Sequence, residues 1–218
     1  ALSALAVKGL SSSQMTALSS DQVVALTTAQ LVGLSSSQVA GIEAGDLDEL
    51  STAQVRALSN TALAGLTTAQ VAGMTTTQVT AFSALQMKAL SSTQLQALTT
   101  AQAAVLTTAQ VQSLSATQVS GMDTADIAQL GTAQIRAMTA ATVAGLTTAQ
   151  VANLSTDQVG ALKADQLKTL TTAQMVAITT AQAAVLTSAQ MAGISATQIA
   201  AMQTEDVAAL STAVISTL

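Results

Sequence analysis

The sequence contains no cysteine, histidine, proline, tryptophan or tyrosine, and its single aromatic side chain is Phe82. Zinc and iron–sulfur centres depend on Cys or His ligands, and cysteine- or histidine-based nucleophilic catalysis needs the same residues. Their absence excludes these classes of site, and the lack of cysteine also excludes a fold held together by disulfides. We therefore expect no enzymatic activity, no cofactor and no small-molecule substrate.

Basic residues are also scarce, since 6 Lys and Arg stand against 11 Asp and Glu, for a net charge of −5. Proteins that bind nucleic acid use many Lys and Arg contacts to phosphate, so this class of partner is not expected. Half of the residues are hydrophobic, but polar Ser and Thr residues interrupt the apolar stretches at short intervals. A transmembrane helix needs about 20 predominantly apolar residues in a row, so we expect no membrane span.

A large apolar residue recurs at every eighth position from Leu2 to Leu218, always as Leu, Ile, Met or Phe. A representative octad is residues 50–57, with the sequence LSTAQVRA, and we number its positions 1 to 8 from the large apolar residue. A fixed short period is typical of solenoids, in which one unit cannot bury its apolar face alone. Because no shift in composition interrupts the array, we expect a single continuous solenoid over residues 1–218.

The consensus octad contains two signals for the start of a helix. Ser51 at position 2 and Gln54 three residues later form a potential capping box, in which the hydroxyl and the amide satisfy backbone groups reciprocally. Leu50 before the cap and Val55 after it are spaced as a hydrophobic staple. The octad therefore predicts a short helix that begins at position 2 or 3.

This helix cannot continue into the next octad. Eight residues at about 100° each leave a rotation of about 80° per octad, so an uninterrupted helix would wind its apolar stripe around all faces. The small residue at position 8, often Gly, leaves room for the chain to turn. We therefore predict an all-α solenoid, a superhelix of very short helices with one helix per eight-residue repeat.

The alternative fold is a β-solenoid, because Val and Thr favour strands. In that fold the most strictly apolar position would be out of phase with the alternation along a strand. Hairpin pairs such as Asn-Gly and Asp-Gly are also absent.

A longer period of 80 residues, or ten octads, lies over the first. Asp replaces Gln at position 5 in Asp46, Asp126 and Asp206. Basic residues at position 7, which we expect to face water, keep the same interval: Lys8, Lys88 and Lys168, and Arg56 and Arg136. One interpretation is duplication of a ten-octad cassette. The other is geometric, with ten helices per superhelical turn, and places Ala103 near Ala183 and Lys88 near Lys168.

Two groups of polar residues are candidate sites. Oxygen ligands such as Asp46, Asp126 and Asp206 could hold calcium, but the spacing is not that of an EF-hand loop, so these three are weak metal candidates and we expect no metal. We expect the acidic residues instead to cap helix starts and to pair with Arg56 or Arg136. The repeated Gln residues are interpreted as a capping ladder, and the Thr ranks, although similar to ice-binding faces, as helix caps.

The string Leu66–Gly73, with the sequence LTTAQVAG, resembles octad arrays in very large secreted or surface proteins of proteobacteria that are described as adhesin-like or haemagglutinin-like. The resemblance extends over the whole chain. It implies a location outside the cell or on the bacterial cell surface, and a role as stalk, fibre or matrix component.

These observations favour a structural extracellular protein that forms a filament, stalk or surface layer by stacking of octads. We expect self-association, end to end or lateral, and a chain that is an excerpt or a protomer of a longer array. The alternative is a soluble solenoid that presents a curved surface, formed by positions 3, 4 and 7, to a binding partner. Those positions are mostly Ala, Ser and Thr, with no aromatic residue and with Arg only at Arg56 and Arg136, so they offer few of the residues that dominate binding energy at interfaces.

Overall fold

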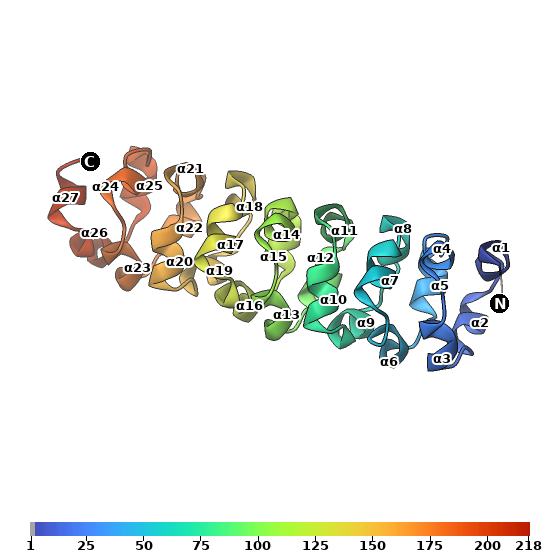
Figure 1. The fold of residues 1–218 in the computed structure, drawn as a ribbon. Helices are drawn as coiled ribbons and strands as arrows, with labels where there is room; N and C mark the ends of the chain where they lie inside the picture. The colour runs from blue at the N-terminus through green and yellow to red at the C-terminus, as the bar shows by residue number, and fades with distance from the viewer. Residues whose placement is uncertain (1–2) are drawn as a thin grey trace. The chain divides into compact units, whose positions relative to one another are not determined.

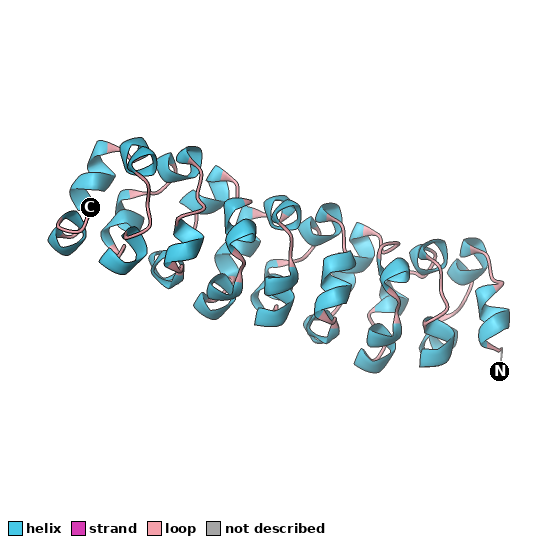
Figure 2. Cartoon of the chain, turned by 90° about the horizontal axis from the view of Figure 1, so that it is seen from above, coloured by secondary structure: helices cyan, strands magenta, loops and turns pink. Residues whose placement is uncertain are grey.

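The structure of the chain is a computed structural model that describes residues 3–218, in which 27 helices of four to six residues alternate with short loops and no strand occurs (Figure 2). The prediction of an all-α solenoid with one helix per octad is confirmed, and the β-solenoid is excluded for this part of the chain. The helices are α1 (Ala4–Lys8), α2 (Ser12–Thr16), α3 (Ser20–Val24), α4 (Thr28–Leu31), α5 (Ser36–Ala40), α6 (Ala44–Leu47), α7 (Thr52–Ala57), α8 (Asn60–Leu63), α9 (Thr68–Gly73), α10 (Thr76–Ala81), α11 (Ala84–Ala89), α12 (Ser92–Gln96), α13 (Thr100–Ala104), α14 (Thr108–Ser113), α15 (Ala116–Gly121), α16 (Thr124–Gln129), α17 (Thr132–Ala137), α18 (Ala140–Ala144), α19 (Thr148–Ala152), α20 (Thr156–Ala161), α21 (Ala164–Leu167), α22 (Thr172–Val176), α23 (Thr180–Ala184), α24 (Ser188–Met191), α25 (Ala196–Ala201), α26 (Thr204–Ala209) and α27 (Thr212–Ile215).

The chain divides into two compact units, Ala1–Ser113 and Leu114–Leu218. Unit 1 contains α1 to α14 and unit 2 contains α15 to α27. Both units are built in the same way from consecutive octads. The single continuous solenoid expected over residues 1–218 stays a prediction.

Within each unit, every helix packs against the helix three octads further along the chain. In unit 1, α1 packs on α4, α4 on α7 and α7 on α10, and in unit 2, α18 packs on α21 and α21 on α24. Hydrogen bonds reach one octad further. Gln54 of α7 donates to the backbone carbonyl of Val24, the last residue of α3, and to that of Leu26 in the loop after α3. One turn of the spiral therefore holds between three and four octads, and in Figure 1 α1, α4, α8 and α11 follow one another along one edge of unit 1.

The interpretation of ten octads as one superhelical turn is wrong. Helix α13, which contains Ala103, packs on α10, and α23, which contains Ala183, packs on α20 and α26. The contact spacing within each unit is thus three octads, and the expected contacts of Ala103 with Ala183 and of Lys88 with Lys168, which would join the two units, stay a prediction. Ten octads correspond instead to about three turns, after which an octad returns to the same face of a solenoid built from identical steps.

The core is formed by positions 1 and 6 of the octads. In the octad of residues 50–57, Leu50 and Val55 are buried, and Phe82 takes the place of Leu at position 1 without leaving the core. Since both positions of nearly every octad point inward, each turn buries its own apolar residues against those of the turns before and after it. No isolated octad has such a surface to pack on, which explains why the fold needs the array.

Glycine at position 8 serves close packing and not the turn for which the sequence suggested it. No residue in the described part of the chain has a positive φ, so the helices end without a left-handed residue. A Cβ atom added to Gly65 would lie 2.1 Å from the backbone oxygen of Ser36, and one added to Gly41 would lie 2.4 Å from that of Ser12. Position 8 of these octads is therefore pressed against position 3 of the octad one turn earlier, where only glycine fits.

Candidate functional site

The consensus residues form the predicted cap at the start of each helix. In α7, the Ser51 hydroxyl accepts a hydrogen bond from the backbone N–H of Gln54 at 3.3 Å, and the backbone N–H of Ser51 donates to Gln54 Oε1 at 2.9 Å. Threonine does the same at Thr27, Thr67 and Thr107, whose hydroxyls accept from the backbone N–H of Gln30, Gln70 and Gln110. These threonine hydroxyls are engaged in helix capping, as a purely structural role requires.

The amide nitrogen of most position-5 Gln residues has a second role that the sequence analysis missed. Gln78 Nε2 donates to three backbone carbonyls of the preceding turn, those of Leu47 at 2.9 Å, Asp48 at 2.9 Å and Leu50 at 2.8 Å. Leu47 is the last residue of α6, and its oxygen also accepts the backbone N–H of Leu50 at 3.2 Å, whereas Asp48 and Leu50 lie past the helix end, where carbonyls lack intrahelical donors. One Gln side chain thus caps the start of its own helix and the end of another helix, and it does so while 2 % exposed.

Position 5 itself carries a signal for this second role. Glu can close a capping box as well as Gln, yet Glu never stands at position 5 of any octad. A carboxylate offers no N–H group to the preceding turn. The strict preference for the amide therefore follows from the contact between turns and not from the local cap.

The three octads with Asp at position 5 lack this link. Asp46 and Asp206 accept hydrogen bonds from the hydroxyls of Ser20 at 2.6 Å and Thr180 at 2.8 Å, so the direction of donation between turns is reversed. Asp126 and Asp206 are each 2 % exposed, and their Oδ2 atoms have no hydrogen-bond partner in the described part of the chain.

The expectation that the acidic residues cap helix starts and pair with Arg56 is wrong for the octad of α6. Glu43 precedes α6 without a side-chain cap, and Asp123 precedes α16 in the same way, because their carboxyls do not accept from the helix amides. The Arg56 Nε–H donates instead to the backbone oxygen of Ala81 at 3.1 Å. In residues 3–113 no ion pair joins Arg56 to Glu43 or to the other acids of that octad, which are Asp46, Asp48 and Glu49.

The weak metal candidates are not brought together. Asp46 lies in α6, which packs on α3 and α9, whereas Asp126 lies in α16, which packs on α19, and Asp206 lies in α26, which packs on α23. Among residues 3–218 no three acidic residues cluster in a way that could hold a metal ion.

Burial has a measurable consequence at one of these carboxyls. Desolvation raises the pKa of Asp126 from 3.8 to about 6, and the neighbouring carboxylate of Asp123 adds to the effect. Within unit 2, α16 packs on α19, which carries no charged residue. No cation on that helix therefore offsets the buried charge.

The basic residues of the 80-residue period are all exposed, as expected for position 7: Lys8, Arg56, Lys88, Arg136 and Lys168. Lys8 extends toward Gly33 and Lys168 toward Gly193, each 25 residues further along the chain. Arg56 makes the equivalent contact through its hydrogen bond to Ala81. Position 7 therefore lies beside position 8 of the next turn.

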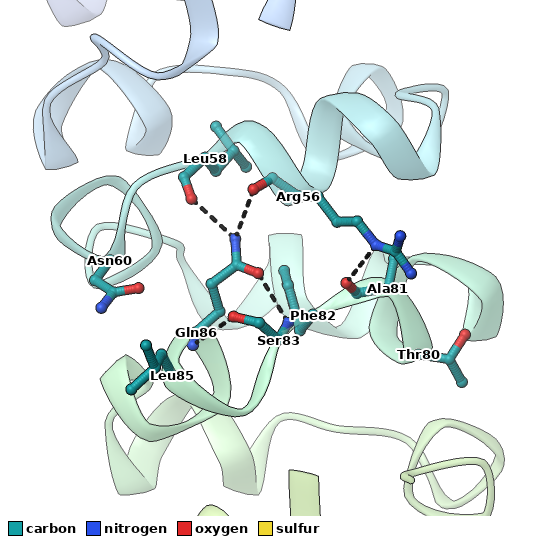
Figure 3. A pocket seen from close by; sticks show the side chains of 9 residues that line it. All are labelled: Arg56, Leu58, Asn60, Thr80, Ala81, Phe82, Ser83, Leu85 and Gln86. Atoms are coloured by element: carbon teal, nitrogen blue, oxygen red, sulfur yellow. Dashed lines mark hydrogen bonds between the residues drawn. The ribbon is translucent and has the colours of Figure 1, made fainter. Parts of the chain in front are cut away.

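An open hollow on unit 1 is the second candidate site, with a volume of about 550 Å³. Its lining includes Arg56, Asn60, Phe82, Leu85 and Gln86, which come from octads on two successive turns. Figure 3 shows Gln86 in the middle of this group, joined to the backbone oxygens of Arg56 and Leu58. The sequence analysis did not identify this site, because its members are nearly 30 residues apart.

Comparison with protein families identifies the repeat as one that is already described. The repeat described as "ALTTAQ repeat" spells residues 97–102, and it matches most of the chain, in residues 1–28, 39–76, 55–84, 79–116, 119–156, 127–164 and 144–172. The chain belongs to the ALTTAQ repeat family. No match was found among curated proteins.

The six letters of the ALTTAQ motif correspond to defined structural positions. They contain the small residue of position 8, the buried residue of position 1, the capping hydroxyl of position 2 and the amide of position 5. The motif thus covers the residues that close one helix, start the next and link it to the preceding turn. The family is defined by the elements that build the spiral.

Proposed function

We propose that the chain is a structural repeat region of a bacterial surface or secreted protein, which serves as a stalk, filament or matrix component. It has no catalytic role in this proposal. The observation that carries it is the amide ladder, the series of Gln side chains typified by Gln78. The Gln78 Oε1 atom accepts from the cap of its own helix, and its Nε2 atom donates to backbone oxygens of the preceding turn. Such an array can be lengthened turn by turn without any change in design.

The outer surface supports the same proposal. Positions 3 and 4 carry mainly Ala, Ser and Thr, and they lack the aromatic and Arg residues that supply most of the energy at protein interfaces. No helix in residues 3–218 is both long and apolar enough to cross a membrane.

The first octads present the chemistry that a further turn would need. Gln14 and Gln22 are exposed, and their Nε2 atoms have no protein acceptor in the described part of the chain. Beside them lies a mainly apolar hollow of about 420 Å³, whose lining includes Val7, Leu10 and Leu26. In our proposal this face accepts octads of another copy of the chain.

The experiment is electron microscopy of the purified chain in negative stain, combined with sedimentation velocity over a range of concentrations. We expect rods or fibres and a sedimentation coefficient that rises with concentration. Gln22→Glu replaces the free amide by a charged group and should reduce association, whereas Asp157→Asn, at an exposed position in unit 2, should not. Monomers at every concentration would refute self-association, and fractionation of the source cells without surface or secreted material would refute the location.

The binding module is the second candidate function, and the hollow beside Arg56 favours it. The two functions are compatible, because a stalk can carry a binding site on its side.

A further inference from the structure

The hollow on unit 1 collects residues that are rare in this chain. Phe82 is the one aromatic residue of the chain, and Arg56 is one of its two arginines. Asn60 is the one asparagine at position 3, where other octads have Ser, Thr or Ala. Leu85 stands at position 4, where Leu5 is the one other large apolar residue. The spiral brings these four departures from the repeat to a single place.

Packing between successive turns produces this convergence. Arg56 and Asn60 belong to neighbouring octads of one turn, and helix α11, which contains Leu85, packs on α8 one turn later. Gln86 holds the two turns together, because its Nε2 donates to the backbone oxygen of Leu58 at 2.9 Å and to that of Arg56 at 3.2 Å. The hollow is therefore formed where the hydrogen bonds of Gln86 join two successive turns.

The ten-octad period offers an internal comparison. The residues 80 positions after Arg56, Asn60, Phe82 and Leu85 are Arg136, Ala140, Leu162 and Asp165. Only the arginine is retained. The packing role of these octads is thus compatible with small or acidic residues, so packing does not require Asn60 or Leu85.

The lining has a definite chemistry. Arg56 is its one charged residue, and the hydrogen bond from its Nε to the backbone oxygen of Ala81 fixes the guanidinium, while its Nη atoms have no protein partner in residues 3–113. The Leu85 side chain is 69 % exposed, whereas Phe82 is almost fully buried. Arginine binds carboxylates through paired N–H groups. The exposed apolar side chain of Leu85 in the same hollow suits a ligand that also has an apolar part.

We propose that this hollow is a binding site for a small organic carboxylate with a short apolar chain. The carboxylate binds the Nη atoms of Arg56, and the apolar chain lies against Leu85 and the edge of Phe82. The exposed amide of Asn60 supplies a further polar contact. The volume of about 550 Å³ lies within the range of about 300–1,000 Å³ that is common for small-molecule sites.

The test is titration of the full isotope-labelled chain with hexanoate, followed by the NMR signals of the Leu85 methyl groups and the Arg56 Nε–H. We expect saturable shifts of these signals at millimolar concentration. Hexanamide, which lacks the charge, and acetate, which lacks the chain, should each bind at least tenfold more weakly. Equal binding of hexanamide would overturn the role of Arg56, and equal binding of acetate would overturn the apolar part.

Variants locate the site. Arg56→Ala should raise the dissociation constant at least tenfold, because a charge-assisted hydrogen bond is lost. Leu85→Thr, which restores a residue common at position 4, should raise it several-fold. Arg136→Ala removes the equivalent arginine of the other unit and should leave binding unchanged. If Arg136→Ala weakened binding as much as Arg56→Ala, or if hexanoate shifted signals over the whole surface, the site would not exist.

Discussion

Replacing Gln78 by Glu tests the ladder directly, because the two side chains have nearly the same size and differ in the donor. The new carboxylate can still accept the backbone N–H of Thr75, which Gln78 Oε1 accepts at 2.9 Å. Its second oxygen, however, would face the backbone oxygens of Leu47, Asp48 and Leu50, which now receive hydrogen bonds at 2.8 to 2.9 Å. Oxygen would oppose oxygen at a site that is 2 % exposed.

The expected cost is about 3–5 kcal/mol at neutral pH, the range for a buried charge that has lost its partner. The pKa of the new carboxyl should be raised by burial. Its neutral form carries an O–H donor, so the loss of stability should shrink as the pH is lowered below that pKa. The assay is urea denaturation followed by circular dichroism at 222 nm, at pH 4.5 and at pH 7.5.

Gln14→Glu is the matched control. Gln14 forms the same capping box, with Oε1 accepting from the backbone N–H of Ser11 at 2.8 Å, but it is exposed and donates to no carbonyl in the described part of the chain. Its substitution should change the free energy of unfolding by no more than about 0.5 kcal/mol. If Gln78→Glu and Gln14→Glu had the same effect, the link between turns would contribute nothing and the reasoning would be refuted.

Two further substitutions test packing and burial. Gly65→Ala should destabilise the chain by about 1–3 kcal/mol, because the added Cβ collides with the backbone oxygen of Ser36. A Cβ added in Gly160→Ala meets nothing within 4 Å, so this control should leave stability unchanged or raise it. Thermal denaturation measures both effects. Asp126 keeps its proton in the folded chain to higher pH than in the unfolded chain, so its contribution to stability is complete below pH 3.8 and is lost as the pH rises to about 6. Asp126→Asn should remove that part of the pH dependence, on the order of 1–3 kcal/mol, and an unchanged pH profile of the melting temperature would contradict this.

The local structure of this chain could be predicted from the sequence, because its signals lie within one octad. Ser51 and Gln54 are three residues apart, and the cap that they form depends on nothing outside residues 50–57. The contact between turns joins Gln54 to residues 28 and 30 positions earlier, and no local pattern encodes that distance. One of the two interpretations of the 80-residue period, that of ten octads per turn, is therefore wrong, and the interpretation as a duplicated cassette stays open.

The hollow was missed for a related reason. Asn60 and Leu85 each depart from the repeat in their own octads, but only the number of octads per turn brings them to one hollow. The inward direction of Asp126 also depends on the turn against which it packs. Sites of this kind can be read from a repeat sequence only after the pitch of the spiral is known.

The ladder is directional. The side-chain amides of Gln54, Gln78 and their counterparts donate to backbone carbonyls nearer the N-terminus. When a polypeptide emerges N-terminus first, from a ribosome or through an export channel, the backbone carbonyls that accept these hydrogen bonds emerge before the Gln amides that donate them. Each new octad can therefore bind to a turn that has already folded. Growth of the spiral is vectorial, and a very long array can form without waiting for its last residue.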